Sequence, residues 1–246
     1  MRYKSLILSL TMATSGAALA VDHAAHWGYE GAAGPEHWGE LDANFTLCTN
    51  GKNQSPVDLT HIVDSNLPPI DFHYAPGGSD EINNGHSIQI NYEGGSGITV
   101  DGHAFELKQF HFHTPSENHI GGKEYPMEAH LVHADADGNL AVIAVMFEEG
   151  ADNAALSAPW SVIPSHADES VHLAAKASAE GLLPENRDYY RFNGSLTTPP
   201  CTEGVVWLVM KEPVTASHEQ ISRFSEIMGH PNNRPIQNLN ARVVID

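Results

Sequence analysis

The chain has 246 residues, a length that fits one domain with a core large enough to be stable alone. It carries 12 Lys and Arg residues against 31 Asp and Glu residues, which gives a formal net charge of −19 at pH 7. This acidic balance argues against nucleic acid or an anionic membrane as a binding partner. The charge favours solubility, but it does not identify a reaction.

Residues 1–20 have the features of a secretory signal peptide. Two cations, Arg2 and Lys4, precede a short apolar stretch, and residues 18–20 supply a small-residue cleavage site. The stretch is too short to span a bilayer, and no later segment qualifies as a membrane span. We therefore expect a mature domain at residues 21–246 and a periplasmic or secreted location. Cleavage would remove two cations and no anion, so the net charge would change from −19 to −21.

Short apolar runs bounded by Gly, Pro, Asn and Asp dominate the rest of the chain and predict many strands. In chain order, the predicted strands are residues 87–92, 97–100, 104–113, 128–133, 140–148 and 204–211. Helical signals are few: short helices are predicted within residues 151–163 and 167–179, and a capped helix is predicted from Ser217 to residue 228, before Gly229. We expect a mainly β (α+β) single domain, built on a large twisted, mostly antiparallel sheet with short peripheral helices.

The chain has two cysteines, Cys48 and Cys201. In an exported protein, an even pair is best interpreted as a disulfide, although two buried free thiols are the alternative. Closing so long a loop would stabilise the fold by roughly 4–5 kcal/mol in the chain-entropy model.

The segment QFHFH, residues 109–113, places two histidines on a predicted strand with one residue between them. Side chains alternate between the two faces of a strand, so His111 and His113 share one face while the phenylalanines point into a core. A neighbouring strand carries His130, which could complete a set of three imidazoles. Three neutral imidazoles with a vacant fourth position are typical of zinc sites that activate water. Strand histidines also occur in cores and on surfaces, so the pair alone is weak evidence.

Two polar residues strengthen the metal interpretation. Glu128 lies two residues before His130, and Gln109 stands in the same relation to His111. Each shares a strand face with its histidine and can accept a hydrogen bond from the ring N–H that does not face the metal. His133 is three residues after His130, so it should face away, into the core or the opposite face.

A cupin metal motif is the rival template, because His111, His113 and Glu117 match its opening. That motif requires glycines at fixed positions, where this chain has Phe105 and Glu124. No matching second motif follows. The cupin interpretation is therefore disfavoured, and Glu117 needs another role.

The sequence as a whole resembles an alpha-class carbonic anhydrase of the exported bacterial type. The resemblance covers essentially the entire mature chain and rests on separate blocks in the correct order. These blocks are residues 26–29, 34–38, 53–58, 83–86, 110–113, 116–117, 128–133, 194–200 and 233–237. The cysteine pair and Thr114-Pro115 resemble the bacterial rather than the vertebrate enzymes.

The resemblance implies roles for individual residues. His111, His113 and His130 would bind Zn²⁺. Thr197 would orient the zinc-bound hydroxide through a hydrogen bond to Glu117, because an ionised glutamate can only accept. Thr198 would help Thr197 hold substrate oxygens, although a Thr-Thr-Pro-Pro segment alone is typical of an ordinary turn. His86 would relay protons between the site and solvent, since an imidazole can accept and release a proton near neutral pH.

The resemblance also implies an apolar wall for carbon dioxide. Its residues would be Val132, Val142, Leu196, Val205 and Trp207. Carbon dioxide is small and nonpolar, so a dry apolar surface suits it. Part of the same surface would be ordinary strand core.

The implied function is that of a carbonate dehydratase, a zinc enzyme for the reversible hydration of carbon dioxide to bicarbonate and a proton. It would act through a zinc-bound hydroxide nucleophile and a histidine proton shuttle. Relatives with the disulfide are often dimers, so a homodimer is also expected. Two alternatives stay open: a non-catalytic zinc-holding or binding member of the same fold, and copper in the same site, since copper binds nitrogen ligands tightly.

Overall fold

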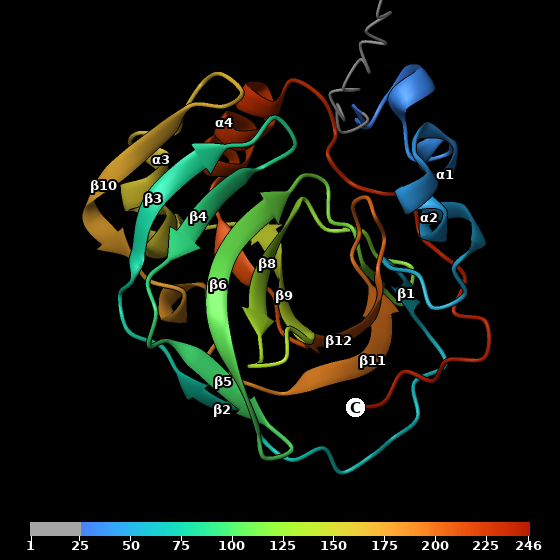
Figure 1. The fold of residues 1–246 in the computed structure, drawn as a ribbon. Helices are drawn as coiled ribbons and strands as arrows, with labels where there is room; N and C mark the ends of the chain where they lie inside the picture. The colour runs from blue at the N-terminus through green and yellow to red at the C-terminus, as the bar shows by residue number, and fades with distance from the viewer. Residues whose placement is uncertain (1–25) are drawn as a thin grey trace, which may run out of the picture.

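A computed structural model describes residues 26–246 of the chain (Figure 1). The predicted signal peptide, residues 1–20, lies outside the described residues. The strands are β1 Asp58–Leu59, β2 Asp71–His73, β3 Gly78–Asn83, β4 Ile88–Tyr92, β5 Gly97–Val100, β6 His103–His113, β7 His119–Ile120, β8 Met127–Ala134, β9 Leu140–Glu149, β10 Ser170–Ala177, β11 Tyr189–Ser195, β12 Glu203–Met210 and β13 Val214–Ala216. The α-helices are α1 Trp38–Leu41, α2 Leu47–Asn50, α3 Ser157–Trp160 and α4 His218–Met228, and short 3₁₀ turns occupy Gly31–Ala33, Ala43–Phe45, Ala154–Leu156 and Glu180–Leu182.

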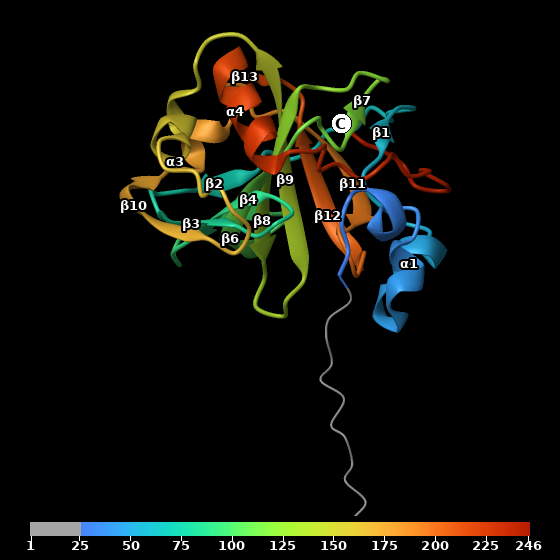
Figure 2. The same cartoon turned by 90° about the horizontal axis from the view of Figure 1, so that it is seen from above.

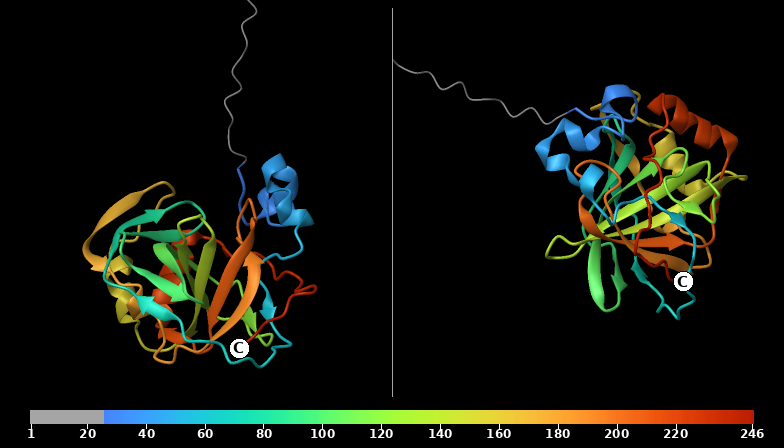
Figure 3. Two further views of the ribbon diagram at one scale, coloured as in Figure 1. Left: turned by 60° about the horizontal axis from the view of Figure 1, so that its bottom comes forward. Right: turned by 90° about the vertical axis from the view of Figure 1, so that its right-hand side faces the viewer.

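A curved sheet of eleven strands organises the molecule. Its main path is β10-β3-β4-β6-β8-β9-β12-β11, with β5 beside β6, β2 beside β5 and β13 beside β9. The pairings are antiparallel except those of β9 with β12 and β13, which confirms the predicted mainly antiparallel sheet. Helices α3 and α4 lie together on one side, whereas α1 and α2 lie near the opposite end (Figures 1 and 2). Two further directions show how strongly the sheet curves (Figure 3).

All six predicted strands are present, and their ends differ from the prediction by one residue at most. The capped helix is also confirmed: Ser217 and Gln220 form a capping box at the start of α4, and Gly229 ends the helix at φ 73°. Residues 151–163 contain α3 and the turn before it, as expected. Strands β1, β2, β3, β7, β11 and β13 were not predicted.

The helix predicted within residues 167–179 is wrong, because this segment forms β10. Its backbone pairs with β3 at the edge of the sheet, where Val171 lies opposite Glu81 and His172 opposite Asp80. Leu173 of β10 is buried in the core. The alanines and lysine of this segment favour a helix locally, and the sheet pairing overrides that preference.

The central strands are buried on both faces, so the sheet separates two apolar clusters. Ile143, Val145 and Phe147 of β9 pack into the cluster that also contains Phe110 and Phe112. The alternate residues of β9 pack into the second cluster, on the opposite face. The side-chain alternation predicted for residues 109–113 is therefore confirmed: the phenylalanines enter the first cluster, and the histidines face the other side.

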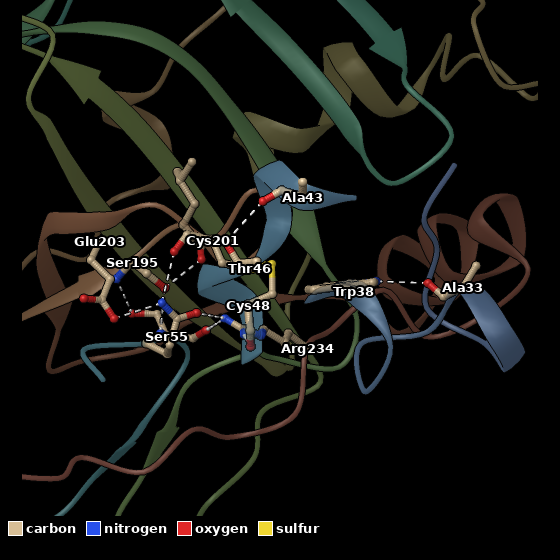
Figure 4. The surroundings of a disulfide bond; sticks show 12 residues. Ala33, Trp38, Ala43, Thr46, Cys48, Ser55, Ser195, Cys201, Glu203 and Arg234 are labelled. Atoms are coloured by element: carbon tan, nitrogen blue, oxygen red, sulfur yellow. Dashed lines mark hydrogen bonds between the residues drawn. A yellow bond between two sulfur atoms is a disulfide. The ribbon is translucent and has the colours of Figure 1, made fainter. Parts of the chain in front are cut away.

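The disulfide between Cys48 and Cys201 is present and joins residues 153 positions apart (Figure 4). Beside it lies Arg234, which is almost fully buried. Its guanidinium donates hydrogen bonds to the carbonyl oxygens of Cys48 (2.9 Å) and Ser55 (2.7 Å) and to the side chain of Gln54 (2.9 Å). The buried cation therefore ties the N-terminal segment to the C-terminal segment.

Among residues 26–246, no helix combines the length and apolarity needed to cross a membrane.

Glu81 is an unusual core residue. Its side chain is 0% exposed, and neither carboxylate oxygen has a hydrogen-bond partner among the described residues. Its neighbours across the sheet are the apolar residues Ile90 and Val171. Burial raises the pKa of Glu81 to about 8, with partial opposition from the charge of Arg223. The carboxyl is therefore protonated in the folded protein at neutral pH.

We predict that Glu81 makes folding stability fall with rising pH. The folded pKa is about 8 against an ordinary value of 4.5, so only the unfolded chain loses the proton between these values. The Glu81 contribution to the free energy of unfolding should decrease by roughly 1.4 kcal/mol per pH unit in that window and level off above it. Glu117, whose pKa is also raised to about 8, contributes to both proteins, so urea unfolding at several pH values should give a slope in Glu81→Gln that is less negative than the native slope by this amount. The exposed Glu226→Gln variant is the control, and equal slopes in all three proteins would contradict the prediction.

Candidate metal centre

Three histidines converge on one face of the sheet. In the antiparallel pairing of β6 with β8, His111 lies directly opposite His130, and His113 lies two residues further along β6. One ring nitrogen from each residue lies within 4.8 Å of the other two. The ring centroids are 4.6 to 5.3 Å apart. The predicted set of three imidazoles is therefore assembled, with a geometry that can hold a metal ion.

The second nitrogen of each ring has an oxygen partner. His111 Nδ1 lies 2.8 Å from Gln109 Oε1, and His130 Nε2 lies 2.9 Å from Glu128 Oε1, as the strand spacing predicted. His113 Nδ1 lies 2.7 Å from the backbone carbonyl of Asn232. These acceptors place the ring protons on the outer nitrogens, so the three converging nitrogens carry free lone pairs.

The third partner was not predicted. The carbonyl of Asn232 is a backbone atom 119 residues beyond His113, and nothing in the local sequence connects the two. Only the position of Asn232, directly before the block of residues 233–237 noted for its resemblance, gave a signal. The Asn232 side chain also holds the β6 backbone, donating to Phe112 O (2.9 Å) and accepting from Thr114 N–H (2.8 Å).

Burial keeps the three imidazoles neutral. It is the main cause that lowers the pKa of His111 and His130 well below the ordinary 6.5, and it also lowers the pKa of His113. Neighbouring imidazoles add to the effect at His111 and His130, because each disfavours a positive charge on the others. Nε2 of His113 is buried without a hydrogen-bond partner among the described residues. A site made of nitrogen ligands, with a buried lone pair that accepts no hydrogen bond, fits a metal cation.

Glu117 lies beside the histidines in a fully buried position. Its Oε2 is 3.5 Å from His113 Nε2, and its Oε1 accepts a hydrogen bond from the Arg234 backbone N–H (2.8 Å). Burial raises the pKa of Glu117 to about 8, and the Arg234 N–H and the Thr197 hydroxyl oppose the rise. Thr197 is therefore close to the carboxylate, although Oε2 has no partner in full hydrogen-bond geometry within residues 26–246.

A cavity of about 140 Å³ opens beside the histidines. It is lined by Trp27, Tyr29, Asn84, His86, Ser87, Gln89, Gln109, His111, His113 and Thr198. The predicted shuttle, His86, is half-buried at this cavity, and its ring stacks on Trp27 with a centroid distance of 3.7 Å. The predicted substrate contact Thr198 lies in the same wall. The structure therefore brings both residues to the histidine cluster.

The apolar residues expected to form a wall belong to one cluster on the same sheet face. Val142, Val205 and Trp207 are buried in this cluster, and Val132 and Leu196 pack against it. The Trp207 ring lies 4.8 Å from the His130 ring. An apolar surface therefore borders the polar metal centre.

His133 has a different environment from the three clustered histidines. It is fully buried on the opposite face, where Nε2 lies 2.6 Å from the Tyr74 hydroxyl. Burial lowers its pKa to about 4. This location confirms the prediction that His133 faces away from the metal centre.

Comparisons with known proteins agree with this geometry. The family model described as eukaryotic-type carbonic anhydrase matches residues 33–246. A carbonic anhydrase from Pectobacterium atrosepticum is 50% identical over 220 residues, which cover 89% of this chain and 90% of that protein.

Solved structures are similar over the same extent. The alpha-carbonic anhydrase of Thermovibrio ammonificans, in complex with the inhibitor sulfanilamide, superposes with a TM-score of 0.89 at 50% identity, covering 91% of this chain and all of that one. Dioscorin complexed with ascorbate is a more distant neighbour, with a TM-score of 0.84 at 29% identity, covering 89% of this chain and 97% of that one. The chain therefore belongs to the carbonic anhydrase family, in its alpha class, and is a carbonate dehydratase.

Proposed function

We propose that this carbonic anhydrase hydrates carbon dioxide reversibly to bicarbonate and a proton, with one Zn²⁺ held by His111, His113 and His130. One observation carries the proposal. Three imidazole nitrogens with free lone pairs converge, and each ring is fixed by an acceptor on its far side. Such outer partners orient metal ligands and raise their basicity.

The donor set favours zinc in a catalytic role. Three histidines without a fourth protein ligand match sites that keep one position for water or substrate. A bound zinc ion supplies Lewis acidity, which makes water a nucleophile at neutral pH. Copper also binds imidazoles tightly, so metal analysis has to separate the two ions.

Glu117 and Thr197 would orient the nucleophile. The positive charge of a metal ion bound by the adjacent histidines would favour the ionised form of Glu117, which burial alone disfavours. An ionised carboxylate can only accept hydrogen bonds, so the Thr197 hydroxyl would donate its proton to Glu117. The Thr197 oxygen would then be left as an acceptor toward the cavity, and an attacking water molecule would donate to it. This arrangement would turn a lone pair of that water toward the substrate carbon. Thr198, in the cavity wall, would hold a substrate oxygen.

Carbon dioxide would rest against the apolar cluster beside the metal centre. Val142, Val205 and Trp207 offer it a dry surface with few hydrogen-bond donors. Transfer of a nonpolar molecule from water to such a surface is favourable. Bicarbonate is strongly hydrated and would lose that hydration free energy against the same surface. The same wall would therefore favour entry of the substrate and release of the anionic product.

His86 would carry away the proton that hydration releases. Its ring lies at the cavity and is partly open to solvent. Burial lowers its pKa below the ordinary 6.5, and the nearby His26 and His230 add to this effect. His86 would therefore be mostly neutral at pH 7, able to accept a proton and to release it readily.

A non-catalytic, zinc-holding or binding member of the fold is the alternative function. The complete histidine set and the adjacent Glu117 argue against it.

Export to the periplasm or beyond the cell and assembly as a homodimer stay predictions from the sequence. The disulfide between Cys48 and Cys201 supports an oxidising location.

The first prediction from this site concerns the ligands. His111→Ala should lose stoichiometric zinc and carbon dioxide hydration together, because two imidazoles hold the ion much less tightly. Zinc content by mass spectrometry and stopped-flow hydration should be measured on protein prepared without added metal. His103→Ala, at the exposed start of the same strand, is the matched control. Native protein that holds zinc but does not hydrate carbon dioxide would support the non-catalytic alternative.

A second prediction concerns the outer partner of His111. Gln109→Ala should weaken zinc binding by about tenfold, because the ring loses the acceptor that fixes its orientation. Competition with a chromophoric chelator measures this affinity. Lys108→Ala changes the exposed neighbouring residue and should leave the affinity unchanged. Equal affinities of both variants would show that Gln109 does not orient the ligand.

A third prediction concerns the proton shuttle. His86→Ala should reduce kcat by roughly tenfold or more in dilute buffer, because proton export becomes limiting. The ratio kcat/KM should be retained, since it does not include that step. Imidazole buffer should restore part of the lost kcat by accepting the proton directly. If His86→Ala shows neither the loss nor the rescue, His86 is not the shuttle.

A further inference from the structure

A row of four aromatic rings leads from His86, which lines the cavity, through Trp27 and Tyr29 to His230. The His86 ring stacks on Trp27 at 3.7 Å, and the Trp27 ring lies 5.8 Å from that of Tyr29. The Tyr29 ring lies 5.9 Å from the ring of His230. His230 follows directly after Gly229, at the end of α4, so a histidine far from His86 in sequence comes to the end of this row.

Hydrogen bonds of Asn232 hold the segment that carries His230 close to the backbone of His86. Asn232 Nδ2 donates a hydrogen bond of 3.0 Å to the carbonyl oxygen of His86. The Asn232 carbonyl accepts from His113 Nδ1, so the segment that carries His230 is also bound to the metal centre. His230 is therefore held beside the His86 loop rather than placed there by chance rotation of an exposed side chain.

One ring nitrogen of His230 is held by a hydrogen bond, and the other is left as an acceptor. Its Nδ1 lies 2.9 Å from the Pro231 carbonyl, to which it donates. This bond assigns the proton of the neutral ring to Nδ1 and leaves Nε2 as the basic nitrogen. The residue is partly exposed, so buffer molecules can reach it.

The charges around His86 couple it to His230. Positive charge on His230 or His26 disfavours protonation of His86, and Asp168 favours it. His230 is therefore close enough to His86 for a charge on it to act on the His86 ring.

We propose that His230 is a second proton-accepting residue, which takes the proton from protonated His86 through solvent and passes it to buffer. This inference rests on the proposed function, since it extends the proton path from the same site. In the transfer, an N–H bond of the His86 imidazolium breaks and an N–H bond forms at His230 Nε2. No other reactant is consumed, and the neutral His86 is ready for the next turnover.

The test uses the zinc-loaded enzyme and the variants His230→Ala, His86→Ala and the double variant. His218→Ala is the matched control, because this exposed histidine begins the helix that His230 follows. In dilute buffer, His230→Ala should reduce kcat by about threefold, less than a direct general base contributes, with kcat/KM unchanged. In the His86→Ala background, removal of His230 should cause no further loss. His218→Ala should have no effect.

A second readout does not depend on activity. NMR titration of the His86 ring should show a higher midpoint pH in His230→Ala than in the native protein, because a repelling charge has been removed. An unchanged midpoint, or an unchanged kcat, would overturn the proposal. A further loss of kcat in the His86→Ala background would also overturn it, since His230 would then act independently of His86. Failure of native enzyme to hydrate carbon dioxide would instead refute the proposed function, while the titration would still measure the coupling.

Discussion

The alternation of side chains on two neighbouring strands, β6 and β8, is the constraint on which the site depends. A shift of one residue in their pairing would move His130 to the apolar face and bring His133 to the other. The phenylalanines between the histidines prevent such a shift, because their burial in the first cluster requires the observed register. The packing of one face therefore sets the geometry of the metal ligands on the other.

Rigid sheet geometry alone does not orient an imidazole ring, which can rotate about its side-chain bonds. The orientation comes from three oxygen acceptors of different origin: a glutamine, a glutamate and a backbone carbonyl. Glu128 is itself held by the backbone N–H groups of Glu117 and Asn118 (2.7 and 2.9 Å). A buried carboxylate with several donors can stay ionised and keep a fixed direction, in spite of the cost of burial. The site is thus supported by a connected polar network inside an otherwise apolar sheet.

The sequence allowed most of the central sheet, the histidine cluster and two of its outer partners to be predicted for a physical reason, whereas the roles of Glu117, Thr197, Thr198 and His86 were expected only from the family resemblance. Strand periodicity reveals which residues share a face, so Gln109 and Glu128 could be assigned to their histidines from spacing alone. The Asn232 carbonyl could not be found in this way, because a backbone acceptor leaves no residue-type signal. Strand β10 was mistaken for a helix because its pairing with β3 is a long-range contact that local propensity does not contain. Glu81 was not noticed for a similar reason, since only the fold shows that its carboxyl lacks a partner.

The contact between His113 and the Asn232 carbonyl also has a consequence for the order of folding. The ring cannot be locked until a segment close to the C-terminus has crossed the sheet and docked against β6. Such long-range contacts form late, because closing a large loop loses chain entropy before the new contact contributes any stabilising free energy. A chain that ends before Asn232 would therefore hold three histidines on two strands without a rigid cage. Binding of a metal ion at these histidines would then be one of the last events of folding, and the ion would stabilise a chain that is already almost fully folded.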